Sequence, residues 1–568
     1  MKKTIILILV AFLLLQCKKT PEVNQENNKI TGFVADSAMV VCAREEAAKI
    51  GTAILKKGGN AFDAMIATHF ALAVSYPFAG NIGGGGFMVY RTNKGKTGAL
   101  DFREKAPLAA SKNMYLDEKG NVIKGKSTLG SVAIGVPGSV DGVFKVYEKY
   151  GTLPFAELIQ PAIDLAKKGV VVTKKQAKSF AKYRKYFSQA NNGTQIMLDT
   201  DWKEGDSIKY LNLAKTLERI RDNGRDGFYK GETADMLVNY VQKLGGIITK
   251  KDLEIYESKW RNAIEFKYKD LNIISMSPPS SGGICIAQIF NAIEPYNIVS
   301  FGHNSVKAIQ LITEAERRAY ADRSFYLGDP DFVKIPIDTL ISSNYTQKRM
   351  ENFSWDKATL SSEVSHGNIV GFESDETTHY SIIDTYGNAI SVTTTLNGAF
   401  GSKVFVPEGG FLLNNEMDDF SSKPGVPNMF GLIGAEANAI QPEKRMLSSM
   451  TPTIVEKNKQ LYMTLGSPGG STIITSVMQT ILNVYEYDLS MQEAVNAPRF
   501  HHQWLPDVIT FEPKGFDSIT TVKLQEKGYK INKKNSRILG KVDAILVLPN
   551  GKLEGGADYR GDDKAAGF

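Results

Sequence analysis

The sequence is poor in cysteine, with only Cys17, Cys42 and Cys285 among 568 residues. So few thiols exclude a scaffold that is held together by disulfides. Cys42 and Cys285 lie in apolar stretches, where we expect two small buried side chains rather than a bridge between them. The fold must therefore depend on a large core, which a chain with 42% hydrophobic residues can supply.

Dense clusters of Lys and Arg interleaved with aromatic residues are also missing. The formal net charge is +7, and Lys2 and Lys3 at the N-terminus supply two of these charges, so the rest of the chain is only mildly basic. Nucleic acid is therefore not an expected partner.

The sequence offers neither a metal-binding spacing nor a nucleotide-binding motif. His69 lies alone in an apolar helical stretch, and the adjacent side chains of His501 and His502 diverge with no third ligand nearby. The glycine run 83–86 lacks the lysine of a P-loop, so it is predicted to be a backbone path too crowded for Cβ atoms. We expect these residues to be structural, and no metal or organic cofactor.

No hydrophobic run is long enough to cross a bilayer as a helix. Residues 1–17 combine Lys2 and Lys3 with an apolar run of the length of an export signal. The run ends in Leu-Leu-Gln-Cys, which resembles a bacterial lipobox with an unusual Gln16 before Cys17. Lipidation of Cys17 and ordinary cleavage near it both stay open, and both export the chain, so we expect a periplasmic protein, lipid-anchored in the first case. The polar residues 18–29 are predicted to be a tether, with the fold beginning near Ile30.

The rest of the chain alternates helical and extended patterns without an internal repeat. Apolar periodicity and end signals predict a series of scaffold helices over residues 47–55, 61–75, 159–168, 211–223 and 233–244. A further helix over residues 314–323 carries interspersed charges of both signs, and we assign it no chemistry.

A β-hairpin is predicted over residues 377–395. Two β-rich runs, 377–384 and 388–395, flank a three-residue loop whose Gly387 can take the left-handed conformation of a bulged turn. Counting outward from this loop, Thr377 faces Thr395. Threonine is common in strands, so this pair alone would suggest nothing beyond structure.

The residues around Thr377 favour a catalytic interpretation. Glu-Ser-Asp-Glu, residues 373–376, directly before Thr-Thr-His-Tyr-Ser resembles the processing junction of the gamma-glutamyltranspeptidases, a family of N-terminal-nucleophile hydrolases. The resemblance implies that the chain cuts itself between Glu376 and Thr377 and that Thr377 becomes the nucleophile. A threonine hydroxyl needs a base, and the new α-amino group, with an ordinary pKa near 7.7 to 8.0, can supply one.

Four further motifs of the same family occur along the chain, one before and three after this junction, and the resemblance extends from about residue 32 to residue 568. They are Asp-Phe-Arg-Glu at 101–104, Asn-Asn-Glu-Met-Asp-Asp-Phe at 414–420, Ser-Ser-Met-Thr-Pro-Thr at 448–453 and Ser-Pro-Gly-Gly-Ser at 467–471.

By this resemblance, one group of residues binds the amino-acid end of the substrate. Arg103, Ser448 and Ser449 would hold its α-carboxylate. Glu416 and Asp419 would hold its α-ammonium from the other side, and Asn397 would contact its backbone atoms.

A second group would carry the chemistry. Thr395 would hold and polarise the hydroxyl of Thr377. Gly469 and Gly470 match the oxyanion-hole residues of the family, at a strand-to-helix turn whose N–H groups suit an anion.

Residues 423–447 are rich in Pro, Gly and Asn, and resemble the lid of bacterial family members. Familiar members have a tyrosine where this chain has Phe430. We therefore expect no lid hydrogen bond to Asn397 and a lid that closes by packing alone.

The resemblance implies an α+β fold, a four-layer αββα sandwich built jointly by a large fragment, 18–376, and a small one, 377–568. The implied activity is hydrolysis and transfer of γ-glutamyl groups from glutathione and related compounds to water, amino acids or peptides. Two alternatives stay open: a related acylase acting on β-lactam (glutaryl) side chains, which the pairing of Arg103 with Asp419 disfavours, and an unprocessed exported binding protein.

Overall fold

The computed structural model describes residues 29–365, 377–429, 431–532 and 537–568. The chain divides at Ile30, and the compact unit runs from Thr31 to Phe568, which confirms the predicted start of the fold. The predicted signal, Cys17, Glu373–Glu376 and Phe430 lie outside the described residues.

Two seven-stranded antiparallel sheets form the centre of this unit. The first has the order β1 (Phe33–Ala35), β19 (Leu553–Ala557), β18 (Asp543–Val547), β15 (Gln460–Gly466), β14 (Thr453–Lys457), β9 (Leu271–Ser275) and β8 (Ile264–Tyr268). The second has the order β20 (Lys564–Gly567), β2 (Met39–Cys42), β10 (Thr378–Ile383), β11 (Ala389–Thr395), β3 (Gly85–Arg91), β4 (Thr97–Asp101) and β7 (Lys259–Arg261).

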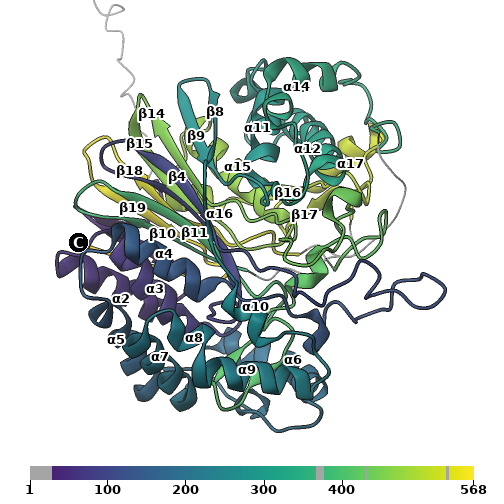
Figure 1. The fold of residues 1–568 in the computed structure, drawn as a ribbon. Coiled ribbons are helices and arrows are strands. Elements are labelled where there is room, and N and C mark those ends of the chain that lie inside the picture. The colour runs from purple at the N-terminus through teal and green to yellow at the C-terminus, as the bar shows by residue number, and fades with distance from the viewer. Residues whose placement is uncertain (1–28, 366–376, 430, 533–536) are drawn as a thin grey trace, which may run out of the picture. The chain divides into compact units, whose positions relative to one another are not determined.

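Helices cover the outer face of each sheet (Figure 1). The layer on the second sheet consists of α2 (Glu45–Lys56), α3 (Ala61–Ser75), α4 (Ser139–Tyr150), α5 (Phe155–Lys168) and α7 (Leu211–Asn223), extended by α6 (Lys174–Ala190), α8 (Asp226–Tyr229), α9 (Gly231–Lys243) and α10 (Lys250–Glu254). The layer on the first sheet consists of α11 (Gly282–Ile293), α12 (Val306–Tyr326), α15 (Thr472–Tyr485) and α16 (Met491–Asn496), with α13 (Ile337–Leu340), α14 (Ser343–Met350) and α17 (Ser518–Glu526) beside them. The predicted four-layer sandwich is confirmed.

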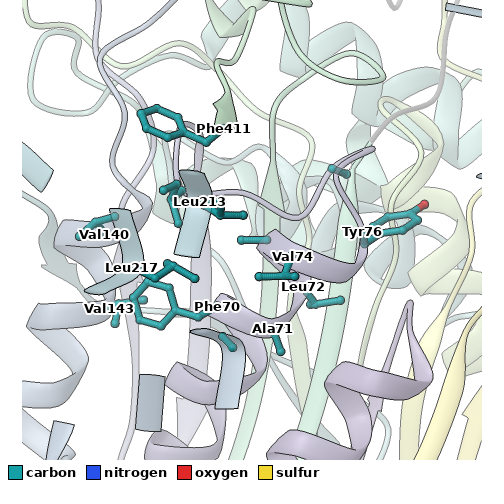
Figure 2. Packing of buried hydrophobic residues seen from close by; sticks show 14 of the residues in the cluster. Phe70, Ala71, Leu72, Val74, Tyr76, Val140, Val143, Leu213, Leu217 and Phe411 are labelled. Atoms are coloured by element: carbon teal, nitrogen blue, oxygen red, sulfur yellow. The ribbon is translucent and has the colours of Figure 1, made fainter. Parts of the chain in front are cut away.

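The helix α3 shows why the first layer forms. Asn60 caps its N-terminus and accepts hydrogen bonds from the backbone of Phe62 and Asp63. All of its residues are buried, because one side packs on β10 and β11 and the other on neighbouring helices. Phe70 lies against α4 and α7, near Val143 and Leu217 (Figure 2).

The hairpin of β10 and β11 has the predicted register. Thr378 pairs with Thr394 and Ile383 with Ala389, which puts Thr377 opposite Thr395. Gly387 in the loop has a φ of 87°. Alternation puts Thr377 on the same face as His379 and Ser381, and Ser381 donates a hydrogen bond to the Asp543 carbonyl of the other sheet. The nucleophile candidate therefore belongs to the face between the sheets.

The helix α12 is buried, although its sequence carries many charged residues. Residues 308–324 are all buried, including Glu314, Arg317, Arg318 and Arg323. Glu314 forms an ion pair of 2.7 Å with Arg318 and accepts a hydrogen bond from the Tyr529 hydroxyl. Glu314 and Arg318 thus satisfy each other inside the protein, where sequence alone indicated an ordinary scaffold helix.

Cys42 and Cys285 are buried free thiols, as predicted. Among the described residues, no helix is both long and apolar enough to cross a membrane.

Replacing Glu314 with Ala is expected to lower the free energy of unfolding by about 3–5 kcal/mol, because buried Arg318 loses its counter-charge and Arg317 keeps only Asp507. Burial opposes ionisation of Glu314, but Arg317 and Arg318 outweigh it and hold its pKa below the ordinary value. The stabilisation is therefore present above about pH 4.3 and lost as the pH falls through the folded-state pKa. Urea unfolding midpoints at several pH values measure it.

Glu45→Ala is the matched control, because Glu45 pairs with Lys49 on an exposed helix surface. Equal, small shifts of the midpoint in both variants would contradict the buried network.

Candidate active site

The site lies where the hairpin ends. Thr377 and Thr395 are 4% and 2% exposed and line one cavity. The backbone N–H of Asn397 donates to the Thr395 Oγ1 at 2.7 Å, which fixes that hydroxyl oxygen.

The glycine run 83–86 allows the chain at the start of β3 to pack closely against the C-terminal end of β11. Gly85 pairs with Thr395, and a Cβ on Gly84 would lie 2.0 Å from the Thr395 carbonyl oxygen. Asn81 donates to the same oxygen at 2.9 Å. The prediction of a crowded backbone path is confirmed, and its function is to let β3 approach the threonine.

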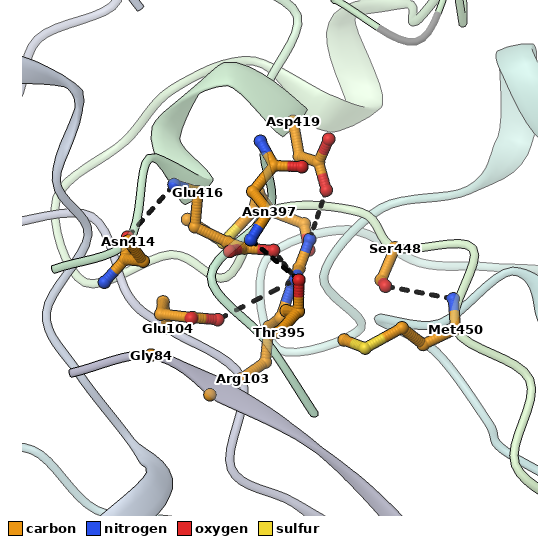
Figure 3. Close-up of polar contacts among 12 residues, drawn as sticks. Gly84, Arg103, Glu104, Thr395, Asn397, Asn414, Glu416, Asp419, Ser448 and Met450 are labelled. Atoms are coloured by element: carbon orange, nitrogen blue, oxygen red, sulfur yellow. Dashed lines mark hydrogen bonds and ion pairs between the residues drawn. The ribbon is translucent and has the colours of Figure 1, made fainter. Parts of the chain in front are cut away.

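Arg103 follows β4 and is 1% exposed. Its backbone is fixed by Asp101, which accepts from the Arg103 N–H at 3.0 Å, and by the Tyr256 hydroxyl, which donates to the Arg103 carbonyl at 2.7 Å. Its guanidinium forms ion pairs with Glu416 and Asp419 (Figure 3). Arg103 and the two acids are therefore in direct contact, because a buried guanidinium needs carboxylates of its own, and their roles toward a substrate stay predictions.

Burial favours the protonated, neutral form of two carboxyl groups near Arg103, those of Glu104 and Glu416. It raises the pKa of Glu104 to about 8 and that of Glu416 well above its ordinary value, although Arg103 acts in the opposite direction on both. Both carboxyl oxygens of Glu104 and the Oε2 of Glu416 have no hydrogen-bond partner among the described residues. At neutral pH, Glu104 is therefore mostly protonated, and the cluster is less negative than its composition suggests.

Ser448 and Ser449 stand in the segment before β14. The backbone N–H of Met450 donates to the Ser448 Oγ at 3.2 Å (Figure 3). The Ser449 Oγ accepts from the Arg323 Nη2 at 3.1 Å. Both serines line the cavity, as does Arg323, which the sequence analysis did not select. Arg323 belongs to the charged helical stretch 314–323 that the sequence analysis noted, but the order of charges along this stretch does not reveal which arginine lines the cavity.

Gly469 and Gly470 form the turn between β15 and α15, with φ values of 135° and 54°. A Cβ on Gly469 would lie 2.5 Å from the Thr472 Oγ1, so the turn requires glycine there. Gly470 is among the residues that line the cavity and Gly469 is not; the Gly469 carbonyl accepts a hydrogen bond from the Thr472 hydroxyl. The helix N-terminus thus presents Gly470 to an anion.

Asn397 has a φ of 70° and donates from Nδ2 to the Asn415 carbonyl at 3.0 Å. The same Nδ2 lies 3.8 Å from the Met429 Sδ, a weak contact from the predicted lid. The lid is also held by hydrogen bonds, since the Asn428 Nδ2 donates to Asp419 at 3.1 Å and the Met429 N–H donates to Asp418 at 2.8 Å. Closure by packing alone was therefore wrong, because polar lid residues beside position 430 bind the acidic turn.

The histidines have the predicted structural role. His69 bonds the Tyr380 hydroxyl at 3.1 Å, His501 the Thr475 hydroxyl at 2.9 Å, and His502 lies 3.2 Å from Asp507. Burial lowers the pKa of His501 to about 3 and that of His502 to about 4, so all three stay neutral near pH 7.

The cavity collects nearly all of the predicted site residues from distant parts of the chain. Its lining includes Arg103, Thr377, Thr395, Asn397, Glu416, Asp419, Ser448, Ser449 and Gly470, together with Arg323, Leu432, Met450 and Ile473.

Comparisons with known proteins cover nearly the whole chain. A sequence model described as gamma-glutamyltranspeptidase matches residues 47–568. The glutathione hydrolase proenzyme of Escherichia coli K12 is 46% identical over 541 residues, which cover 94% of this chain and 92% of that one. Among solved structures, a cephalosporin acylase from Bacillus halodurans has a TM-score of 0.82 at 25% identity, covering 96% of this chain and 99% of its own.

The gamma-glutamyltranspeptidase of Helicobacter pylori has a TM-score of 0.55 at 45% identity, covering 57% of this chain and 93% of the compared one. The family model and the Escherichia coli relative extend over nearly the whole sequence. This chain belongs to the gamma-glutamyltranspeptidase family.

Proposed function

We propose that the chain hydrolyses glutathione and other γ-glutamyl compounds and transfers their γ-glutamyl group, using Thr377 as an N-terminal nucleophile. One observation carries the assignment: Thr377 lies opposite Thr395 and lines the same buried cavity as Arg103 and Asp419. A hydroxyl nucleophile thus lies beside groups of both charges, which suit the zwitterionic end of an amino acid.

Self-cleavage creates the nucleophile. The Thr377 Oγ attacks the carbonyl carbon of Glu376, the peptide C–N bond breaks, and the nitrogen takes a proton to become the α-amine of Thr377. Water then hydrolyses the resulting ester and leaves a carboxylate on Glu376. The two fragments form a heterodimer, which is supported by the pairing of β10 with β2 across the cut.

Acyl transfer uses the same atoms. The Thr377 Oγ attacks the γ-amide carbon, and its proton passes to the α-amine, which must be neutral to accept it. The oxyanion of the tetrahedral intermediate is stabilised by N–H groups at Gly469 and Gly470. The intermediate collapses to an ester, and the leaving amine takes the proton. Water or the amine of an amino acid or peptide then attacks the ester and restores Thr377.

The other residues orient the substrate. Arg103, Ser448 and Ser449 bind the α-carboxylate, Asp419 and Glu416 the α-ammonium, and Asn397 the adjacent backbone atoms. Thr395 holds the Thr377 hydroxyl. Fixing the amino-acid end in this way brings the γ-carbon within reach of the nucleophile.

A second candidate is a side-chain acylase, which is favoured by the structural similarity to the cephalosporin acylase. Such an enzyme would use the same nucleophile on a glutaryl group, which has no α-ammonium. Asp419 would then lack a cationic partner on the substrate.

Export is proposed from the N-terminal sequence. Lys2 and Lys3 before an apolar run support a signal, and the Leu-Leu-Gln-Cys motif supports lipidation of Cys17 in the periplasm.

Thr377→Ala is expected to remain one chain and to lose activity by at least about 10³-fold, since neither step has a nucleophile. Thr395→Ala should slow cleavage and turnover by about 10–100-fold, because one hydrogen bond to a reacting group is lost. A denaturing gel, N-terminal sequencing of the smaller band and a γ-glutamyl anilide assay measure both steps. Thr385→Ala, in the hairpin loop, should stay cut and active, and a cut, active Thr377→Ala would refute the mechanism.

γ-Glutamyl anilide is expected to exceed glutaryl anilide in kcat/KM by about 10²-fold, because only the former can pair with Asp419. Asp419→Asn should reduce this preference, since the amide keeps the shape but not the charge. Equal rates on both anilides, or a glutaryl preference, would support the acylase.

Cys17→Ser is expected to abolish incorporation of a labelled fatty acid and to release the protein from the membrane fraction. Labelling that persists in the variant would disprove the lipobox. Cys42→Ser is the control, because that thiol is buried in the folded unit.

A further inference from the structure

Arg323 is a buried cation on the cavity wall without an acidic partner of its own. It is 4% exposed, and within the described ranges no carboxylate lies at ion-pair distance from it. Arg103, on the same cavity, has both Glu416 and Asp419. Burial lowers the pKa of Arg323 although Asp419, the ion-pair partner of Arg103, acts in the opposite direction, and a guanidinium still keeps its proton near pH 7. An uncompensated buried charge is costly, so a counter-charge is expected from elsewhere.

Arg323 contacts Ser449 directly and is linked to Ser448 through Ser281. Its Nε donates to the Ser281 Oγ at 2.9 Å, and the Ser281 hydroxyl donates to the Ser448 carbonyl at 2.7 Å. Its Nη2 donates to the Ser449 Oγ at 3.1 Å. Arg323 therefore fixes the segment that carries Ser448 and Ser449.

These contacts also set the direction of the serine hydroxyls. The Ser449 oxygen accepts from Arg323, and the Ser448 oxygen accepts from the Met450 N–H, so each hydroxyl keeps its own proton to donate. In the part of the chain that the structure describes, neither serine hydroxyl donates to a protein acceptor. Two donors and one unpaired positive charge thus converge on the cavity, as a carboxylate requires.

We propose that Arg323 is a positioning residue for the α-carboxylate of the γ-glutamyl substrate. It orients Ser449 as a donor and supplies the positive charge, while the charge of Arg103 is balanced by Glu416 and Asp419. This inference rests on the proposed function and adds a specificity residue to it. A purely structural role has its own physical basis, because Arg323 lies in the last turn of α12, where the helix dipole stabilises a cation.

Two substrates separate these roles: γ-glutamyl anilide, and 4-aminobutyryl anilide, which keeps the ammonium but lacks the carboxylate. Arg323→Gln is expected to raise KM for γ-glutamyl anilide by about 10–100-fold with kcat changed less than about 3-fold. Its kcat/KM for 4-aminobutyryl anilide should stay within about 2-fold of the unsubstituted protein. Arg323→Lys should recover part of the lost affinity, since it restores the charge without the fork of donors.

Arg318→Lys is the matched control, because Arg318 is buried on the same helix but paired with Glu314. It should leave the ratio of kcat/KM for the two anilides unchanged. Each variant is first checked for self-cleavage on a gel. If Arg323→Gln is not cut, Arg323→Lys and Ser281→Ala carry the test, and each should lower the ratio at least about 3-fold.

An unchanged ratio in the cut variants, or an equal loss on both anilides, would overturn the role of Arg323. Failure of the unsubstituted protein to hydrolyse γ-glutamyl anilide would instead count against the proposed function itself.

Discussion

The pairing of β10 between β2 and β11 is the constraint on which the rest of the structure depends. β2 precedes the proposed cut and β11 follows it, and both pair with β10 by backbone hydrogen bonds. Thr377 stands one residue before β10, so the ladder holds it in place whether or not the preceding peptide bond is intact. A chain can therefore break at this point and keep the new terminus where the chemistry needs it.

The same antiparallel order explains why distant motifs meet. In the second sheet, β10 begins where β11 and β4 end, so Thr377, Asn397 and Arg103 lie at one edge. In the first sheet, β14 begins and β15 ends at the corresponding edge, which brings Ser449 and Gly470 there. Thr377, Asn397, Arg103, Ser449 and Gly470 thus lie beside strand ends, are held by rigid strands and line the same cavity.

Local signals allowed the hairpin and several helices to be predicted from the sequence, because strand alternation, Gly387 and helix end signals act over a few residues. The four-layer arrangement was predicted only through the family that the motifs resemble. The motifs, through the family they resemble, identified most of the cavity lining. Arg323 and the contacts of Met429 could not be predicted in this way, since their partners lie more than a hundred residues away or depend on how a loop folds back. The periodicity of the sequence also did not predict that α12 is buried. Its charged residues suggest an exposed helix, but the surrounding helices and loops cover it in the fold.

The charge balance of the cavity connects the fold to substrate choice. Protonated Glu104 removes one negative charge, Glu416 and Asp419 pair with Arg103, and Arg323 has no carboxylate at ion-pair distance in the described parts of the chain. A zwitterionic amino-acid end brings an ammonium toward the acids and a carboxylate toward Arg323, so both of its charges find partners at once. A glutaryl group has only the carboxylate, so Glu416 and Asp419 would gain no ammonium as a partner. Burial strengthens this difference, because each unpaired charge in a dry cavity costs more than it would in water.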